Sequence, residues 1–112
     1  MDHAKLTDHV RFSEEGPERS TVFESDHLWS QVICLDRNQS YGPVTDPEAD
    51  ALLTVLAGEC AVQLVKKRKR LGQWGAVLVP ARSPLSVTNA SADPLVLLLV
   101  TAPPPAPATP AP

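Results

Sequence analysis

The sequence predicts an all-β domain, built as an antiparallel sandwich or barrel. Short runs of strand-forming residues recur between residues 21 and 101, turn residues separate them, and helical periodicity is almost absent. Strands of this length at this spacing are typical of sandwiches and barrels. The expected strands are residues 22–24, 28–35, 51–57, 60–66, 75–79, 85–88 and 95–101.

Turn signals fall between these runs and set their ends. Examples are Asp36-Arg37-Asn38, Gly42-Pro43, Asp46-Pro47 and Ser83-Pro84. Three regions follow from this pattern. Residues 1–20 form a polar, flexible or edge-forming arm, and residues 21–102 form the barrel. Residues 103–112 form a Pro/Ala-rich tail, expected to be disordered because it cannot bury a core.

The composition is that of a single globular domain. Apolar residues make up 43% of the 112 residues, and no run approaches the roughly 18 apolar residues that a membrane span needs. No apolar segment follows Met1-Asp2-His3, so we predict no secretory signal, no membrane association and a cytoplasmic location. Cys34 and Cys60 lie in apolar surroundings without paired spacing, which predicts buried free thiols.

The charge is unevenly distributed. The net charge is −3, yet Lys66-Lys67-Arg68-Lys69-Arg70 holds five of the ten basic residues. We expect this run to form a hairpin between strands at Cys60–Val65 and Leu71–Val79, solvated and protected from edge-to-edge pairing. A patch for an anionic ligand or an acidic partner is an alternative, and a localisation signal is another. The net charge and the 4% aromatic content argue against a nucleic-acid partner.

Two of the expected strands are apolar on both faces. They are Leu52-Leu53-Thr54-Val55-Leu56 and Leu95–Val100. A strand that shows one face to a core alternates in polarity, so these runs need cover on both sides. One face fills the barrel, and we predict that the other meets a partner subunit in a homodimer.

Residues 42–59, "GPVTDPEADALLTVLAGE", resemble the first motif of the cupins, a superfamily of small double-stranded β-helix (jelly-roll) barrels. That motif runs from glycine through His-x-His and Glu to a second glycine. Counting back from Gly58 places its glutamate at Ala51 and its histidines at Val44 and Asp46. The ending "VLAGE" is similar to the common "VLEGE".

Residues 75–89 resemble the second cupin motif, which runs from glycine through Pro-x-Gly to His and Asn. Gly75, Pro80 and Asn89 match, whereas Arg82 stands at a glycine place and Leu85 at the histidine place. The resemblance covers roughly residues 28–102 and implies a cupin barrel. It fails at all four metal-ligand positions, and Val44, Ala51 and Leu85 have no donor atom. We therefore predict no metal and no cofactor.

The resemblance also implies which residues line the barrel interior. They are Gln31, Ile33, Val44, Asp46, Ala51, Leu53, Leu85 and Val87. Such a lining suits a small-molecule-binding, regulatory or scaffold module. It equally suits a filled core in which Asp46 caps the turn before Pro47.

An alternative function is a metal-independent isomerase, epimerase or cyclase. Asp46 would act as acid or base, with Tyr41 or His27 as its partner. A third reading is a cupin that binds a metal through other ligands.

Overall fold

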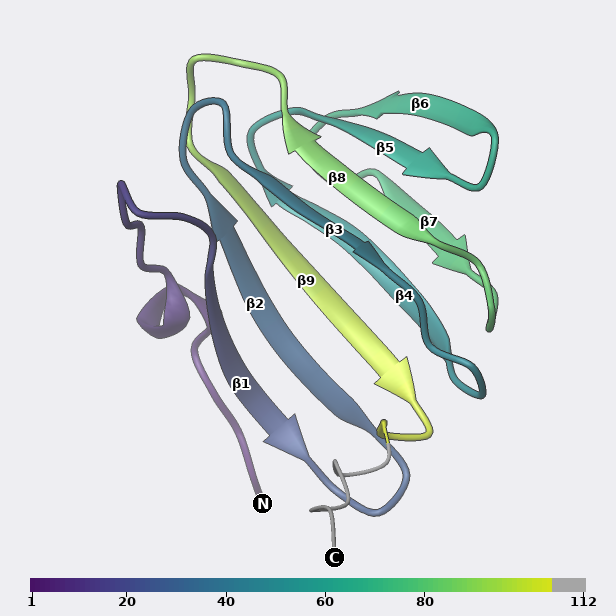
Figure 1. The fold of residues 1–112 in the computed structure, drawn as a ribbon. Coiled ribbons are helices and arrows are strands. Elements are labelled where there is room, and N and C mark those ends of the chain that lie inside the picture. Colours follow the sequence, from purple (N-terminus) through teal and green to yellow (C-terminus); the bar gives the residue numbers. More distant parts are fainter. Residues whose placement is uncertain (106–112) are drawn as a thin grey trace, which may run out of the picture.

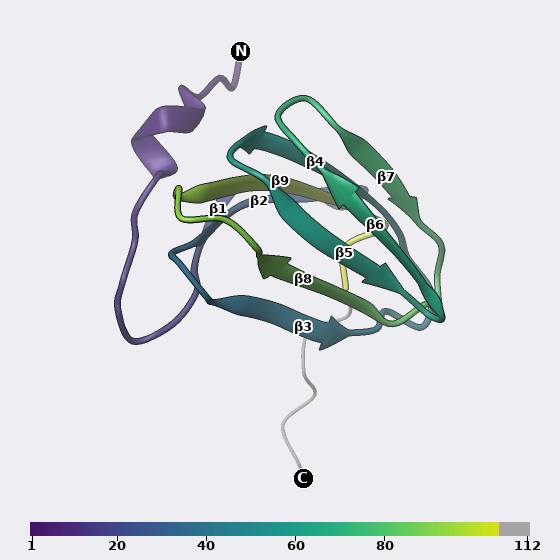
Figure 2. The same ribbon diagram turned by 90° about the horizontal axis from the view of Figure 1, so that it is seen from above.

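The chain folds into two antiparallel sheets that face each other (Figures 1 and 2). The computed structural model describes residues 1–105. The larger sheet has the strand order β1-β2-β9-β4-β7, and the smaller has the order β3-β8-β5-β6. The elements are η1 (Leu6–His9), β1 (Glu18–Glu24), β2 (Trp29–Leu35), β3 (Ser40–Val44), β4 (Asp50–Ala57), β5 (Cys60–Leu64), β6 (Lys67–Leu71), β7 (Ala76–Val79), β8 (Leu85–Asn89) and β9 (Leu95–Ala102).

The predicted all-β architecture is confirmed, and seven of the strands lie where the sequence predicts them. The described part of the chain contains no helix with the length and apolar character that a membrane crossing requires. The arm predicted for residues 1–20 holds the short 3-10 helix η1, and β1 begins at Glu18, before the predicted barrel boundary. Most of the predicted tail, residues 106–112, lies outside the described residues.

The prediction missed β3 and β6. Gly42-Pro43 lies inside β3, where it resembles a turn. The strand tolerates it because β3 is an edge strand whose register with β8 shifts between Tyr41 and Val44. The basic run was wrongly assigned to a hairpin turn. The turn comprises only Val65 and Lys66, and Lys67–Leu71 is itself a strand paired with β5.

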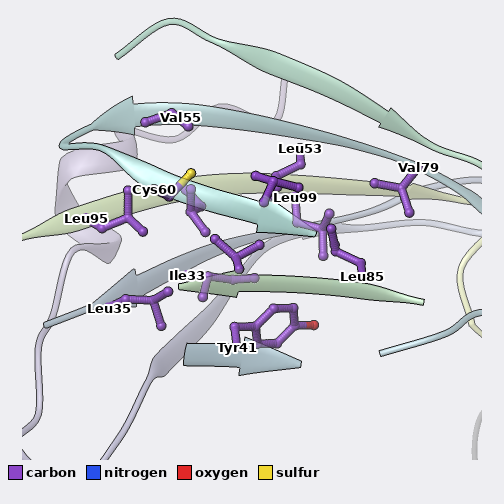
Figure 3. Close-up of a cluster of buried hydrophobic side chains, with 13 residues drawn as sticks. Ile33, Leu35, Tyr41, Leu53, Val55, Cys60, Val79, Leu85, Leu95 and Leu99 are labelled. Atoms are coloured by element: carbon purple, nitrogen blue, oxygen red, sulfur yellow. The ribbon is translucent and has the colours of Figure 1, made fainter. Parts of the chain in front are cut away.

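The main core lies between the two sheets (Figure 3). Side chains alternate inward and outward along the strands, so that in β8 Leu85, Val87 and Asn89 are buried while Ser86 and Thr88 are partly exposed. The buried residues of the main core are Ile33, Leu35, Tyr41, Leu53, Val55, Cys60, Val62, Val79, Leu85, Val87, Leu95, Leu97 and Leu99.

A second apolar cluster covers part of the outer face of the larger sheet. Val32, Cys34 and Val96 are buried there, and Leu6 and Phe12 of the N-terminal segment pack against them. The chain itself thus covers part of the second apolar face, for which the sequence predicts contact with a partner subunit.

The rest of this face, on β7 and β4, stays open. Leu78, Leu52 and Val100 stand in register across β7, β4 and β9. Leu78 is 62% exposed and Leu52 is 47% exposed.

Candidate functional site

A cavity of about 160 Å³ opens at one end of the space between the sheets. The strands β2, β3, β4, β7, β8 and β9 and the loop between β3 and β4 contribute to its walls. Figure 3 shows Val79 and Leu85, which line the cavity, toward one end of the core cluster, with Leu99 nearer its middle. Leu35, Val55 and Leu95 lie toward the other, filled end. The lining residues are Trp29, Gln31, Tyr41, Val44, Thr45, Asp46, Ala49, Ala51, Val79, Pro80, Ser83, Leu85, Leu99, Thr101 and Pro105.

The cavity brings together the four positions at which the resemblance places cupin metal ligands. Val44 and Leu85 are directly opposite each other on β3 and β8. Ala51 lies on the facing sheet, and Asp46 follows β3 in the loop. All four line the cavity, together with the predicted residue Gln31.

The other predicted residues lie elsewhere. Ile33, Leu53 and Val87 have no exposed surface and belong to the core cluster, one layer deeper than the cavity lining. Tyr41 lines the cavity and is 8% exposed. His27 is exposed in the loop between β1 and β2, where its backbone N–H donates a hydrogen bond to Ser25 Oγ at 3.2 Å.

Sequence reasoning missed several lining residues that one row of the larger sheet supplies. Trp29, Thr101, Ala51 and Val79 stand in register across β2, β9, β4 and β7. Alternation places Trp29 on the same face as Gln31, which was the available signal. The register that joins this row to Ala51 depends on strand pairing, so it could not be read from the sequence.

Asp46 holds the loop between β3 and β4 in place. Its Oδ1 accepts backbone N–H bonds from Glu48 at 2.9 Å and Ala49 at 2.8 Å. Its own carbonyl oxygen accepts the N–H of Arg82 at 2.7 Å, which ties this loop to the loop between β7 and β8. Asp46 therefore caps the turn before Pro47, one of the two roles that the sequence suggests for it, while also lining the cavity.

Buried polar groups converge on the same space. Gln31 is 2% exposed and Thr101 is 6% exposed, and both line the cavity. Among the described residues that line it, none is Lys, Arg or His, and Asp46 is the one acid. The site is an apolar hollow with a few hydrogen-bonding groups and a negative charge at its entrance loop.

The residues present do not fit the metal that cupins usually hold. Val44, Ala51 and Leu85 offer no nitrogen, oxygen or sulfur atom in their side chains, and Asp46 already uses Oδ1 on two backbone groups. Within residues 1–105, no group of three or more His, Cys, Asp or Glu side chains could hold a metal ion. This donor set supports neither the family's metal centre nor one built from other ligands in the described region.

The two cysteines are buried free thiols, as the sequence predicts. Burial raises the pKa of the Cys60 thiol to about 11, although a hydrogen bond with the Leu71 backbone opposes the shift. Burial also raises the pKa of Cys34. Thiols in this state are poor nucleophiles, so they supply no chemistry to the cavity.

Comparison with known proteins identifies the fold family. No protein-family model and no curated protein matches the chain. Among solved structures, TT1209 from Thermus thermophilus is 30% identical with a TM-score of 0.89, covering 94% of this chain and 100% of its own. An uncharacterized conserved protein with a double-stranded β-helix domain from Klebsiella pneumoniae is 20% identical with a TM-score of 0.86, covering 92% and 90%.

A third similar structure carries the family name. It is an RmlC-like cupin protein from Desulfovibrio desulfuricans, 20% identical with a TM-score of 0.83, covering 93% of this chain and 98% of its own. The chain therefore has the double-stranded β-helix fold that this cupin protein shares, in a small single-domain form. Val44, Asp46, Ala51 and Leu85 stand where the resemblance to the cupin motifs places the metal ligands.

Proposed function

We propose that this protein is a metal-free cupin that binds a small molecule in the cavity beside Asp46, as a binding or regulatory module. The observation that carries the proposal is that the cavity is open at the four positions where the resemblance places metal ligands, three of which hold apolar side chains and the fourth Asp46. Binding sites for small molecules are usually apolar hollows with a few well-placed polar groups. Gln31, Tyr41 and Thr101 provide such groups here.

The size and charge of the cavity restrict the ligand. A volume of about 160 Å³ has room for roughly five water molecules at ~30 Å³ each. The ligand is therefore compact. Because the described lining has one acid and no base, the cavity favours neutral or cationic molecules over anions.

Tryptophan fluorescence tests the proposal. The chain has two tryptophans, of which Trp29 lines the cavity and Trp74 is 73% exposed. In a Trp74→Phe variant, the remaining emission reports on the cavity. We expect saturable changes in this emission with compact neutral or cationic amides, amines and polyols. Native mass spectrometry of the gently purified protein should also reveal any co-purified ligand.

A matched pair of substitutions distinguishes the cavity from the surface. Ala51→Leu fills the cavity, whereas Ala61→Leu adds the same atoms to β5 opposite Thr88 and Arg70, away from the cavity. Ala51→Leu should abolish the fluorescence response and Ala61→Leu should retain it. Equal responses in both variants would contradict the proposed site.

An acid–base enzyme is the second candidate, because Asp46 and Tyr41 line the same cavity. His27, the other suggested partner, does not. The two backbone bonds that Asp46 Oδ1 accepts favour binding over proton transfer. Loss of turnover in Asp46→Asn, with ligand affinity unchanged, would favour the enzyme.

We also propose that the protein forms a homodimer through the open half of the larger sheet's outer face. The exposed row of Leu78 and Leu52 supports this, because monomers rarely leave adjacent large apolar side chains in water. Leu78→Lys should raise the monomer fraction in light scattering. Val65→Lys is the control, because it alters a residue of similar exposure (54%) in the turn between β5 and β6, and it should leave the monomer fraction unchanged. A monomer mass for the unmodified protein at micromolar concentration would refute the dimer.

The two free thiols support a reducing compartment, which agrees with the predicted cytoplasmic location.

A further inference from the structure

A second hollow, of about 300 Å³, lies on the open side of the barrel between β6 and β7. These strands are the last members of the smaller and larger sheets, so no strand closes the gap between them (Figures 1 and 2). Val62, Leu64 and Leu71 of the smaller sheet and Val77 of the larger sheet line the hollow. We call this hollow the β6–β7 groove.

Two lysines of the basic run point to the groove and not away from it. Lys69 is directly opposite Val62, and Lys67 is directly opposite Leu64. Val62 is 3% exposed and faces the core, so its cross-strand partner faces the same side of the sheet. The next residue along, Arg70, pairs with Ala61 and faces the other side.

The groove therefore combines an apolar floor with a cationic rim. Lys67 and Lys69 line it. Arg68 also lines it, although it pairs with Gln63 and so lies on the same face of β6 as Arg70. None of the described residues that line the groove is acidic. Lysine stems cover apolar surface well while their ammonium groups stay in water. The ligand that complements both parts has an apolar chain and one anionic head.

We propose that the β6–β7 groove binds a free single-chain amphiphilic anion, of the alkyl carboxylate class. The chain lies against Val62, Leu64 and Val77, and the carboxylate pairs with Lys67 and Lys69 at the rim. This site is separate from the cavity beside Asp46, with which it shares no lining residue, and it has the opposite charge preference. The proposal does not depend on the function proposed for that cavity.

Inward-facing lysines on an edge strand also prevent edge-to-edge pairing. That role accounts for the charge, but it requires no hollow. It also predicts that Lys69 and Arg70 contribute equally to the attraction of any anion, because they are neighbours on one strand. A binding groove predicts instead that Lys69 contributes more than Arg70 to the binding of the anion.

Calorimetric titration with laurate, kept monomeric, tests the proposal. We expect saturable binding to the full-length protein, at least tenfold weaker binding of hexanoate because less apolar surface is buried, and none of acetate. Lys69→Glu should weaken laurate binding about tenfold. Arg70→Glu makes the same charge change on the opposite face and should weaken it less than about threefold, since solvent and salt screen it.

A groove-filling variant provides the second arm. Val77→Phe should abolish laurate binding. If circular dichroism shows that Val77→Phe lowers the folded fraction, Ala76→Trp replaces it as the groove-filling variant and should also abolish binding, because Ala76 is exposed and lines the groove. The proposal is overturned by equal effects of Lys69→Glu and Arg70→Glu, or by equal affinity for hexanoate and laurate. Salt-sensitive binding to anionic vesicles or to a DNA oligonucleotide, without laurate binding, would overturn it in favour of a diffuse cationic surface.

Discussion

One carboxylate oxygen of Asp46 accepts two backbone hydrogen bonds in the loop between β3 and β4, and two substitutions of Asp46 separate this structural role from its charge. Asp46→Ala removes both hydrogen bonds that Oδ1 accepts, from Glu48 N at 2.9 Å and Ala49 N at 2.8 Å. Asp46→Asn removes the charge but keeps an oxygen in the same place. If the turn cap is what matters for folding, the two variants differ in stability.

The expected loss of unfolding free energy follows from how deeply the two donor N–H groups are buried. Ala49 is 3% exposed, so its N–H has little access to water once the oxygen is gone, and an unsatisfied buried donor costs about 1–3 kcal/mol. Glu48 is exposed, so water replaces its bond at a cost below about 1 kcal/mol. We therefore expect Asp46→Ala to lower the free energy of unfolding by about 2 kcal/mol, and Asp46→Asn by less than about 0.5 kcal/mol.

Urea denaturation at pH 7, followed by tryptophan fluorescence and circular dichroism, measures both values. Glu48→Ala is the control, because it removes a carboxylate from the same loop without removing either bond, and its change should stay within about 0.5 kcal/mol. Equal destabilisation by the alanine and asparagine variants would refute the reasoning. It would mean that the charge of Asp46, and not its two hydrogen bonds, stabilises the fold.

Two further predictions concern the scaffold. Gly58 has φ +87°, and a Cβ there would lie 2.5 Å from the Pro94 carbonyl oxygen, so Gly58→Ala should lower the melting temperature by more than about 10 °C. Gly72→Ala is the control, because a Cβ there would lie 4.0 Å from its nearest neighbour, and it should change the melting temperature by only a few degrees. Similar losses in both variants would contradict the described turn. Because burial raises the pKa of Cys60 from 9.0 to about 11, the folded thiol keeps its proton between these values while the unfolded thiol loses it, and the unfolding free energy should fall by up to about 1.4 kcal/mol per pH unit there. Urea titrations between pH 8 and 11 should give a shallower decline for Cys60→Ala, and an unchanged slope would show that another group is responsible.

The fold was predictable because turn residues and short apolar runs are local signals. The two strands that escaped prediction, β3 and β6, have sequences that favour turns or solvent. Gly42-Pro43 interrupts β3, and Lys67–Leu71 is almost entirely charged. Both are edge strands whose structure comes from pairing with one neighbour, β8 or β5. Pairing is a tertiary effect, which local propensity does not contain.

The site was partly predictable for a similar reason. The resemblance to the cupin motifs implies that Ile33, Leu53 and Val87 point into the barrel, and the structure places all three in the core cluster. Alternation tells which face of a strand a residue occupies. It does not tell how deep a residue lies, so these three were grouped with Val44 and Ala51, which line the cavity. The depth depends on the register between strands.

The apolar residue at position 85, where the resemblance places a metal-binding histidine, has a physical reason. Leu85 and Val44 face each other across β8 and β3, and Leu85 is 2% exposed. A histidine left alone at the place of Leu85 would be a buried polar group without its metal, and an unpaired polar group in such surroundings costs several kcal/mol. Without a metal, the free energy of folding therefore favours an apolar residue at position 85, whereas Val44 is 36% exposed, so burial does not require an apolar residue there. Asp46 can remain because two backbone N–H groups satisfy its carboxylate without a metal.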